Sequence, residues 1–150
     1  DIQSYDDGMT KLTMTHDDLI VGSGMEQGVR KGWPVVLSSL KSYLETGQGL
    51  NVFARINHQE NATKVDMTLR PTEVIVFGNP KVGTPLMICA QEVALDLPQK
   101  VLVYENAEGK TWLAYNDPMY LKQRHHIEGC DEVLNKISGV LGNLTNAAAK

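Results

Sequence analysis

The sequence predicts an α+β fold, in which a mostly antiparallel sheet of about five strands carries helices packed on one face. Two observations support this prediction. Five short runs rich in β-branched and aromatic residues are interspersed with four or five segments of helical periodicity. The runs at 100–105 and 111–115 are separated by a short turn containing Gly109, which predicts an antiparallel hairpin and excludes an all-parallel sheet.

The N-terminal third is predicted to hold one strand and one helix, joined by a long glycine-rich connection. Residues 1–10 are polar and are expected to form a loose lead-in. Residues 11–16 alternate apolar and polar side chains, which predicts a half-exposed first strand. A helix is expected over 32–45, because apolar residues recur there on one helical face. These residues are Trp33, Leu37, Leu40 and Leu44.

A second strand is predicted over 50–57. Its alternation predicts that Val52, Ala54 and Ile56 face the core. Residues 58–66 are short and polar, and they give only a weak helical pattern.

The most informative stretch runs from Thr72 to Leu86, where a strand, a polar glycine loop and a helix start follow one another. Residues 72–77 have the composition of a strand buried on both faces. The sequence Gly-Asn-Pro then ends the strand, and Thr84-Pro85 predicts a helix cap followed by proline in the first turn. Residues 85–94 are nearly all apolar, so we expect that helix to be buried.

The C-terminal part is predicted to hold two further helices. Asp117-Pro118 has the residue types of a cap and a first helical position, which predicts a short helix. Residues 133–144 show the strongest amphipathic pattern of the chain. The tail at 146–150 is expected to be loose.

Size and charge narrow the functional classes. With 150 residues, 42% of them hydrophobic, the chain is expected to form one domain over 1–150 with its own core. A net charge of −4 argues against a nucleic-acid partner, because phosphate binding needs a basic face. The sequence has no run of eighteen apolar residues, which argues against a membrane span.

The first residue and the cysteines bear on localisation. The chain begins at Asp1, without an initiator Met or an apolar leader, which fits a removed leader as well as a shortened chain. Cys89 and Cys130 allow one disulfide, and two buried thiols are the alternative. We therefore expect an exported or periplasmic protein, and otherwise a cytoplasmic one.

Two segments resemble a known family. They are RPTEVIVFGNPKVGTPLM and LDLPQKVLVYENAEGKTWLAYNDPMYLKQRH, and they are similar to the bacterial and archaeal family called domain of unknown function 302. The resemblance covers about residues 51–127. It implies a compact α+β domain of the TATA-binding-protein-like fold group and no established activity. The family's common motif falls here on Gly78, Asn79, Pro80, Lys81, Gly83, Thr84, Pro85, Tyr115, Asn116, Pro118, Arg124 and His125, and neither cysteine belongs to it.

The loop at 78–84 has the glycine spacing of a phosphate-binding loop, but it lacks the Lys-Ser or Lys-Thr pair that follows the second glycine in nucleotide-binding proteins. Two interpretations stay open. The helix end and Lys81 hold an anion, or the loop residues serve only the backbone as turn and cap.

The segment from Tyr115 to His125 is a second candidate. If its helix lies beside the loop, the two segments form one pocket for a small anionic ligand. The predicted binding residues are Asn79, Lys81, Gly83, Thr84, Tyr115, Asn116, Arg124 and His125. The alternative is a structural polar network between helix and hairpin.

Other chemistry has less support in the sequence. Adjacent residues on a helix point about 100 degrees apart, so His125 and His126 are poor partners for one metal ion, and no metal or cofactor is predicted. We favour a ligand-binding domain. Two alternatives are an enzyme with His125 as general acid or base, and a domain that pairs through a sheet edge with a partner or with itself as a homo-oligomer.

Overall fold

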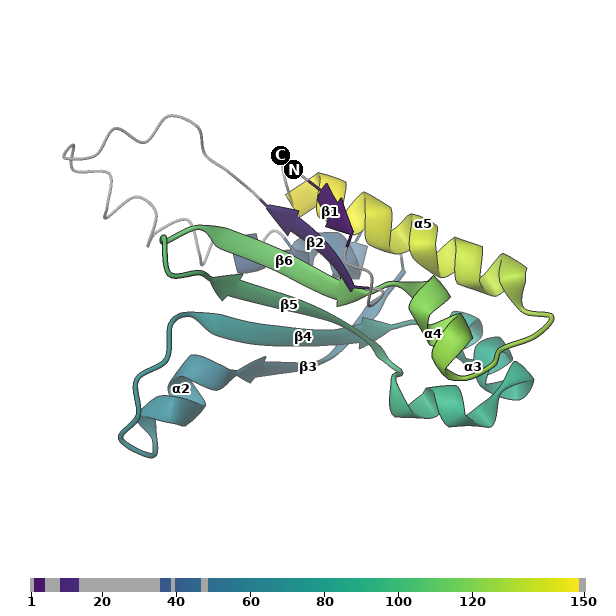
Figure 1. Ribbon diagram of the computed structural model, residues 1–150, viewed down its shortest axis with the longest axis horizontal. Coiled ribbons are helices and arrows are strands. Elements are labelled where there is room, and N and C mark those ends of the chain that lie inside the picture. Colours follow the sequence, from purple (N-terminus) through teal and green to yellow (C-terminus); the bar gives the residue numbers. More distant parts are fainter. Residues whose placement is uncertain (1, 5–8, 14–35, 39, 47–48, 149–150) are drawn as a thin grey trace.

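The computed structural model describes residues 2–4, 9–13, 36–38, 40–46 and 49–148, and one antiparallel sheet organises them (Figure 1). The strands follow the order β1-β2-β6-β5-β4-β3, and every neighbouring pair is antiparallel. The bounds are β1 Ile2–Ser4, β2 Met9–Thr13, β3 Asn51–Asn57, β4 Thr72–Gly78, β5 Gln99–Glu105 and β6 Thr111–Asn116. The α+β class and the antiparallel sheet are therefore confirmed.

Helices lie beside the sheet and at its ends, and the long α5 runs alongside it (Figure 1). Residues 36–38 and 40–46 are helical, in the region where a helix was predicted; residues 32–35 and 39 lie outside the described part. The other bounds are α2 His58–Thr63, α3 Pro80–Cys89, the 3-10 helix η1 Gln91–Leu95, α4 Pro118–Arg124 and α5 Asp131–Ala148.

The core lies on one face of the sheet. The inward side chains of the central strands, among them Ile75, Val101 and Leu113, are fully buried together with leucines of α3, α4 and α5. On the other face, Val74, Leu102 and Ala114 lie side by side and are only half-buried. The expectation that 72–77 is buried on both faces is therefore wrong, because only one face of β4 is buried.

Strand β3 differs from its prediction because of a β-bulge. The register with β4 shifts between Val52 and Ala54, and a shift of one residue moves every later side chain to the opposite face. Val52 packs against the core, whereas Ala54 and Ile56 are exposed on the other side. The prediction that all three face the core is wrong for the last two.

Helix α3 begins five residues earlier than predicted. Asn79 is the N-cap, and its side chain accepts a hydrogen bond from the backbone N–H of Lys81 at 2.9 Å. Pro80 is the first helical residue and Pro85 lies inside the helix, so Thr84 is not the cap. The expected burial of 85–94 is also wrong, since Ile88 is 80% exposed and only a few neighbours are buried.

Three C-terminal predictions are confirmed, but the expectation of a loose tail is wrong at 146–148, which belong to α5; residues 149–150 lie outside the described part. Strands β5 and β6 form the expected hairpin, and Gly109 occupies a left-handed position in its turn. The Asp117 side chain caps α4 by accepting from the N–H of Met119 at 2.8 Å. Helix α5 includes the amphipathic segment 133–144, and its apolar face is buried.

The N-terminal strands lie partly where other structure was expected. Strand β1 and the first residues of β2 fall within the lead-in at 1–10. The first strand was predicted over 11–16, and β2 covers its first three residues; residues 14–16 lie outside the described part.

Candidate functional site

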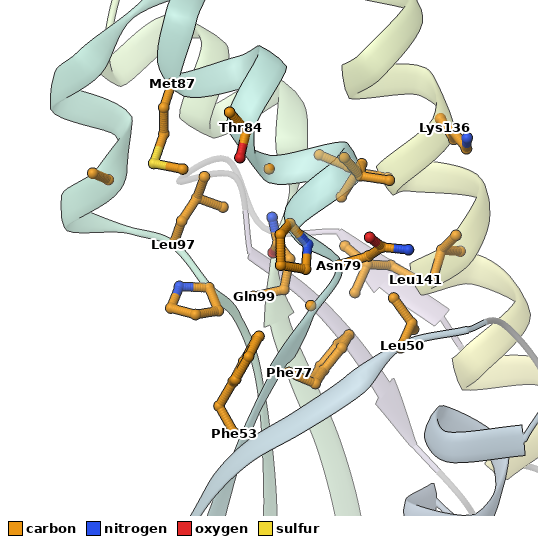
Figure 2. Close-up of a pocket in the computed structure, with 18 residues that line it drawn as sticks. Leu50, Phe53, Phe77, Asn79, Thr84, Met87, Leu97, Gln99, Lys136 and Leu141 are labelled. Atoms are coloured by element: carbon orange, nitrogen blue, oxygen red, sulfur yellow. The ribbon is translucent and has the colours of Figure 1, made fainter.

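A cavity of about 240 Å³ lies at the end of the sheet where β4 stops and β5 starts (Figure 2). Its walls come from three directions: Phe53 and Phe77 from the sheet, Val82 and Met87 from α3, and Leu141 from α5. The lining is mostly apolar. Its polar side chains among the described residues are Asn79, Thr84, Gln99 and Lys136.

Local sequence explains why the chain leaves room here. Strand β4 ends at Gly78, and the Asn79 cap turns the chain at once into α3, which lies at this end of the sheet (Figure 1). A disulfide between Cys89 and Cys130 joins the end of α3 to the start of α5, with Cα atoms 6.5 Å apart. Two walls of the cavity are therefore linked covalently.

The N-terminus of α3 has its backbone donors engaged. Pro80 has no N–H, and the N–H of Lys81 donates to the Asn79 side chain. The N–H groups of Val82 and Gly83 both donate to the Asn79 carbonyl oxygen at 2.9 Å. A helix end binds an anion through free N–H groups, so an anion at this end would depend on side chains instead.

Arg124 and His125 lie at the end of α4 and contact Asp96, which follows η1. The His125 Nε2 is 2.5 Å from one carboxylate oxygen, and an Arg124 guanidinium nitrogen is 3.4 Å from the other. The His125 side chain is only 6% exposed. This cluster ties α4 to the connection before β5.

The structure places the predicted site residues in two groups. Asn79, Gly83 and Thr84 line the cavity. The other five are not among its lining residues, and two of them belong to the Asp96 cluster; the five are Lys81, Tyr115, Asn116, Arg124 and His125. The two predicted segments thus do not meet at this cavity.

Sequence reasoning missed several residues that line the cavity. Gln99 is a polar residue in phase with the buried Val101 and Val103, and this alternation could have drawn attention to it. Lys136 carried no comparable signal, because a lysine on an amphipathic helix is usual.

A second buried polar residue lies on β4. Glu73 is 3% exposed, and its carboxylate accepts a hydrogen bond from the Arg55 Nε on β3 at 2.5 Å. This hydrogen bond, together with the carboxylate charge, raises the pKa of Arg55 above its ordinary value.

The described residues form neither a metal-binding cluster nor a membrane-spanning helix. No three His, Cys, Asp or Glu side chains there gather closely enough to hold a metal ion. None of the helices in that part of the chain is both long and apolar enough to cross a membrane.

Comparison with known proteins identifies a family and a fold. The family whose sequence model matches residues 25–144 is described as Domain of unknown function DUF302. A crystal structure of an uncharacterised conserved DUF302 protein from Bacillus stearothermophilus has a TM-score of 0.72. It covers 94% of this chain and 98% of its own at 17% identity, so the likeness concerns the fold.

Two sequence relatives have names that refer to an ion channel. Proteins called fluoride-specific ion channel FluC 1 from Brucella suis and Brucella abortus are each 43% identical over 103 residues. The match covers 67% of this chain but only 40% and 38% of those proteins. The chain therefore spans well under half the length of these relatives.

Proposed function

This chain belongs to the DUF302 family, a domain of unknown function, and we propose that it binds a small organic molecule in the cavity between the sheet, α3 and α5. The observation that carries the proposal is the cavity itself. It is concave and mostly apolar, with a few polar side chains, which is the usual composition of a small-molecule site.

The volume limits the size of the ligand. Sites for drug-sized ligands have volumes of roughly 300–1,000 Å³. A cavity of about 150 Å³ holds benzene. At about 240 Å³, this cavity suits a substituted ring or a short chain.

Lys136 supports the prediction from the sequence that the ligand is anionic. This residue is the charged side chain among the described lining residues. An acidic group on the ligand would lie toward it at the edge of the cavity, while the apolar body contacts Phe53 and Phe77. Lys81 and Arg124 do not line the cavity, and in this proposal they do not contact the ligand.

The alternatives have less support. His125 is nearly buried and engaged with Asp96, as expected for a structural contact rather than for a base open to substrate. Strand β3 forms one of the two edges of the described sheet, and its bulge and the charged Arg55 are features that oppose edge pairing there.

We also propose that the protein is exported and that its fold belongs to the TATA-binding-protein-like group. A disulfide persists in an oxidising compartment, so the pairing of Cys89 with Cys130 supports an exported protein. An antiparallel sheet with its core on one face is compatible with the TATA-binding-protein-like fold group.

The proposal is tested by filling the cavity. Val140 lies in the lining, and Val140→Phe should abolish the binding of fragments found by ligand-detected NMR while the protein stays folded. Lys81→Ala is the matched control and should leave binding unchanged. Fluoride, the ion in the relatives' name, is included as a separate probe.

The reverse pattern would contradict the proposal. If Lys81→Ala weakens binding and Val140→Phe does not, the ligand sits at the outer surface of α3, as in the anion interpretation. If fluoride binds and organic fragments do not, the cavity is not the functional site.

A further inference from the structure

Gln99 differs from the rest of the cavity lining. It is the first residue of β5 and lies opposite Phe77 on the helix-facing side of the sheet. Figure 2 shows its amide among the apolar side chains that surround the cavity. The residue is only 8% exposed, and its Nε2 has no hydrogen-bond partner among the described residues.

A buried amide nitrogen without an acceptor is costly. Leaving such a group unsatisfied costs more free energy than an average hydrogen bond contributes, so native proteins nearly always provide a partner. Glu73, another buried polar residue of the described strands, follows this rule, because its carboxylate accepts a hydrogen bond from Arg55. The Nε2 itself is almost inaccessible, so an acceptor in the cavity would reach it after the amide rotates toward the cavity, and such a ligand would supply the missing partner.

We infer that the ligand carries a hydrogen-bond acceptor oxygen, which it directs at the Gln99 amide, on an otherwise apolar body. This inference rests on the proposed function and specifies the ligand class. A carbonyl oxygen and a carboxylate oxygen share the required chemistry. The apolar body packs on Phe53, Phe77 and Met87, which line the same cavity.

Four compounds of similar size test the inference on the full chain. Toluene has no polar group, acetophenone offers a neutral acceptor, benzoate offers a charged acceptor and aniline offers chiefly a donor. We expect acetophenone to bind about 3- to 10-fold more tightly than toluene, since this ratio corresponds to one net hydrogen bond. Dissociation constants come from NMR titration.

Two variants assign the preference to the residue. Gln99→Leu removes the donor and should bring the ratio of acetophenone to toluene affinity close to one. Gln99→Met repeats the test with a side chain of similar length. Lys136→Met separates the acceptors, because it should weaken benzoate binding more than acetophenone binding.

The outcomes distinguish this inference from the proposed function. Equal binding of toluene and acetophenone, a preference for aniline, or an unchanged ratio in Gln99→Leu would overturn the inference while leaving the cavity as a binding site. If none of the four compounds binds, both the inference and the proposed function are wrong.

Discussion

Each end of the central strands β4 and β5 buries one polar residue, and the two residues differ in whether the chain supplies a hydrogen-bond partner. At one end, Glu73 of β4 is bonded to Arg55 of the neighbouring strand. At the other end, Gln99 of β5 lines a cavity, and its amide nitrogen has no partner among the described residues. Both side chains face the core. A buried polar group that is hydrogen-bonded within the chain is structural, whereas one that lacks a partner beside a cavity indicates a ligand.

The same ends also differ in what covers them. The Gln99 end is enclosed by α3 and α5, which the disulfide joins (Figure 1). The Glu73 end is followed by α2, which has no buried residue, and by exposed apolar side chains at Val65 and Met67. The cavity therefore lies at the more enclosed end of the sheet.

The largest expected effect comes from breaking the covalent link at the cavity end. The disulfide closes a loop with a sequence separation of 41 residues. Loss of that constraint on the unfolded chain should cost about 4 kcal/mol in Cys89→Ser/Cys130→Ser. Urea unfolding of the double variant and of the oxidised and reduced parent chain measures this. A loss well below 1 kcal/mol would show that the link contributes little to the cavity end.

A smaller effect is expected at the opposite end. Arg55→Met removes the partner of the buried Glu73 carboxylate. Because the arginine itself is 44% exposed and its interaction is partly screened, we expect a loss of about 2 kcal/mol, below the range for a fully buried pair. The free energy of unfolding from urea titration measures the effect.

The control is the double variant Arg55→Met/Glu73→Gln, which removes the buried charge as well and should recover part of the loss. Acetophenone affinity should stay unchanged in Arg55→Met, since neither residue lines the cavity. A changed affinity would mean that the two ends are coupled and would remove the contrast between them.

Local signals made the C-terminal half of the fold predictable. The hairpin turn, the Asp117 cap and the amphipathic α5 each depend on residues close together in sequence. Two predictions were wrong because no local signal in the sequence decided them. Asn79-Pro80 and Thr84-Pro85 are both suitable helix starts, and the fold uses the first. The bulge after Val52 has no strong sequence signature, so the faces of β3 could not be assigned.

The placement of the predicted site residues and of the cavity was harder to predict, because the contacts involved are distant in sequence. Asp96 and His125 are separated by 29 residues, and no spacing rule connects them. The cavity also joins β3, α3 and α5, which only the folded chain brings together. Gln99 is the exception. Its place in the alternation with Val101 was visible, but its missing partner was not.

The smallest expected effect has the opposite sign and tests the comparison most directly. In the absence of ligand, Gln99→Leu removes a buried amide that lacks a partner, so the free energy of unfolding should rise by about 0.5 kcal/mol. At a given saturating concentration, a ligand stabilises the folded chain by an amount that grows with the logarithm of its affinity, so acetophenone should stabilise the parent chain more than the variant and reduce or reverse the difference. Urea unfolding with and without acetophenone measures both signs. A variant that is less stable without ligand would mean that the Gln99 amide, like the Glu73 carboxylate, is satisfied within the chain, and the contrast between the two ends would disappear.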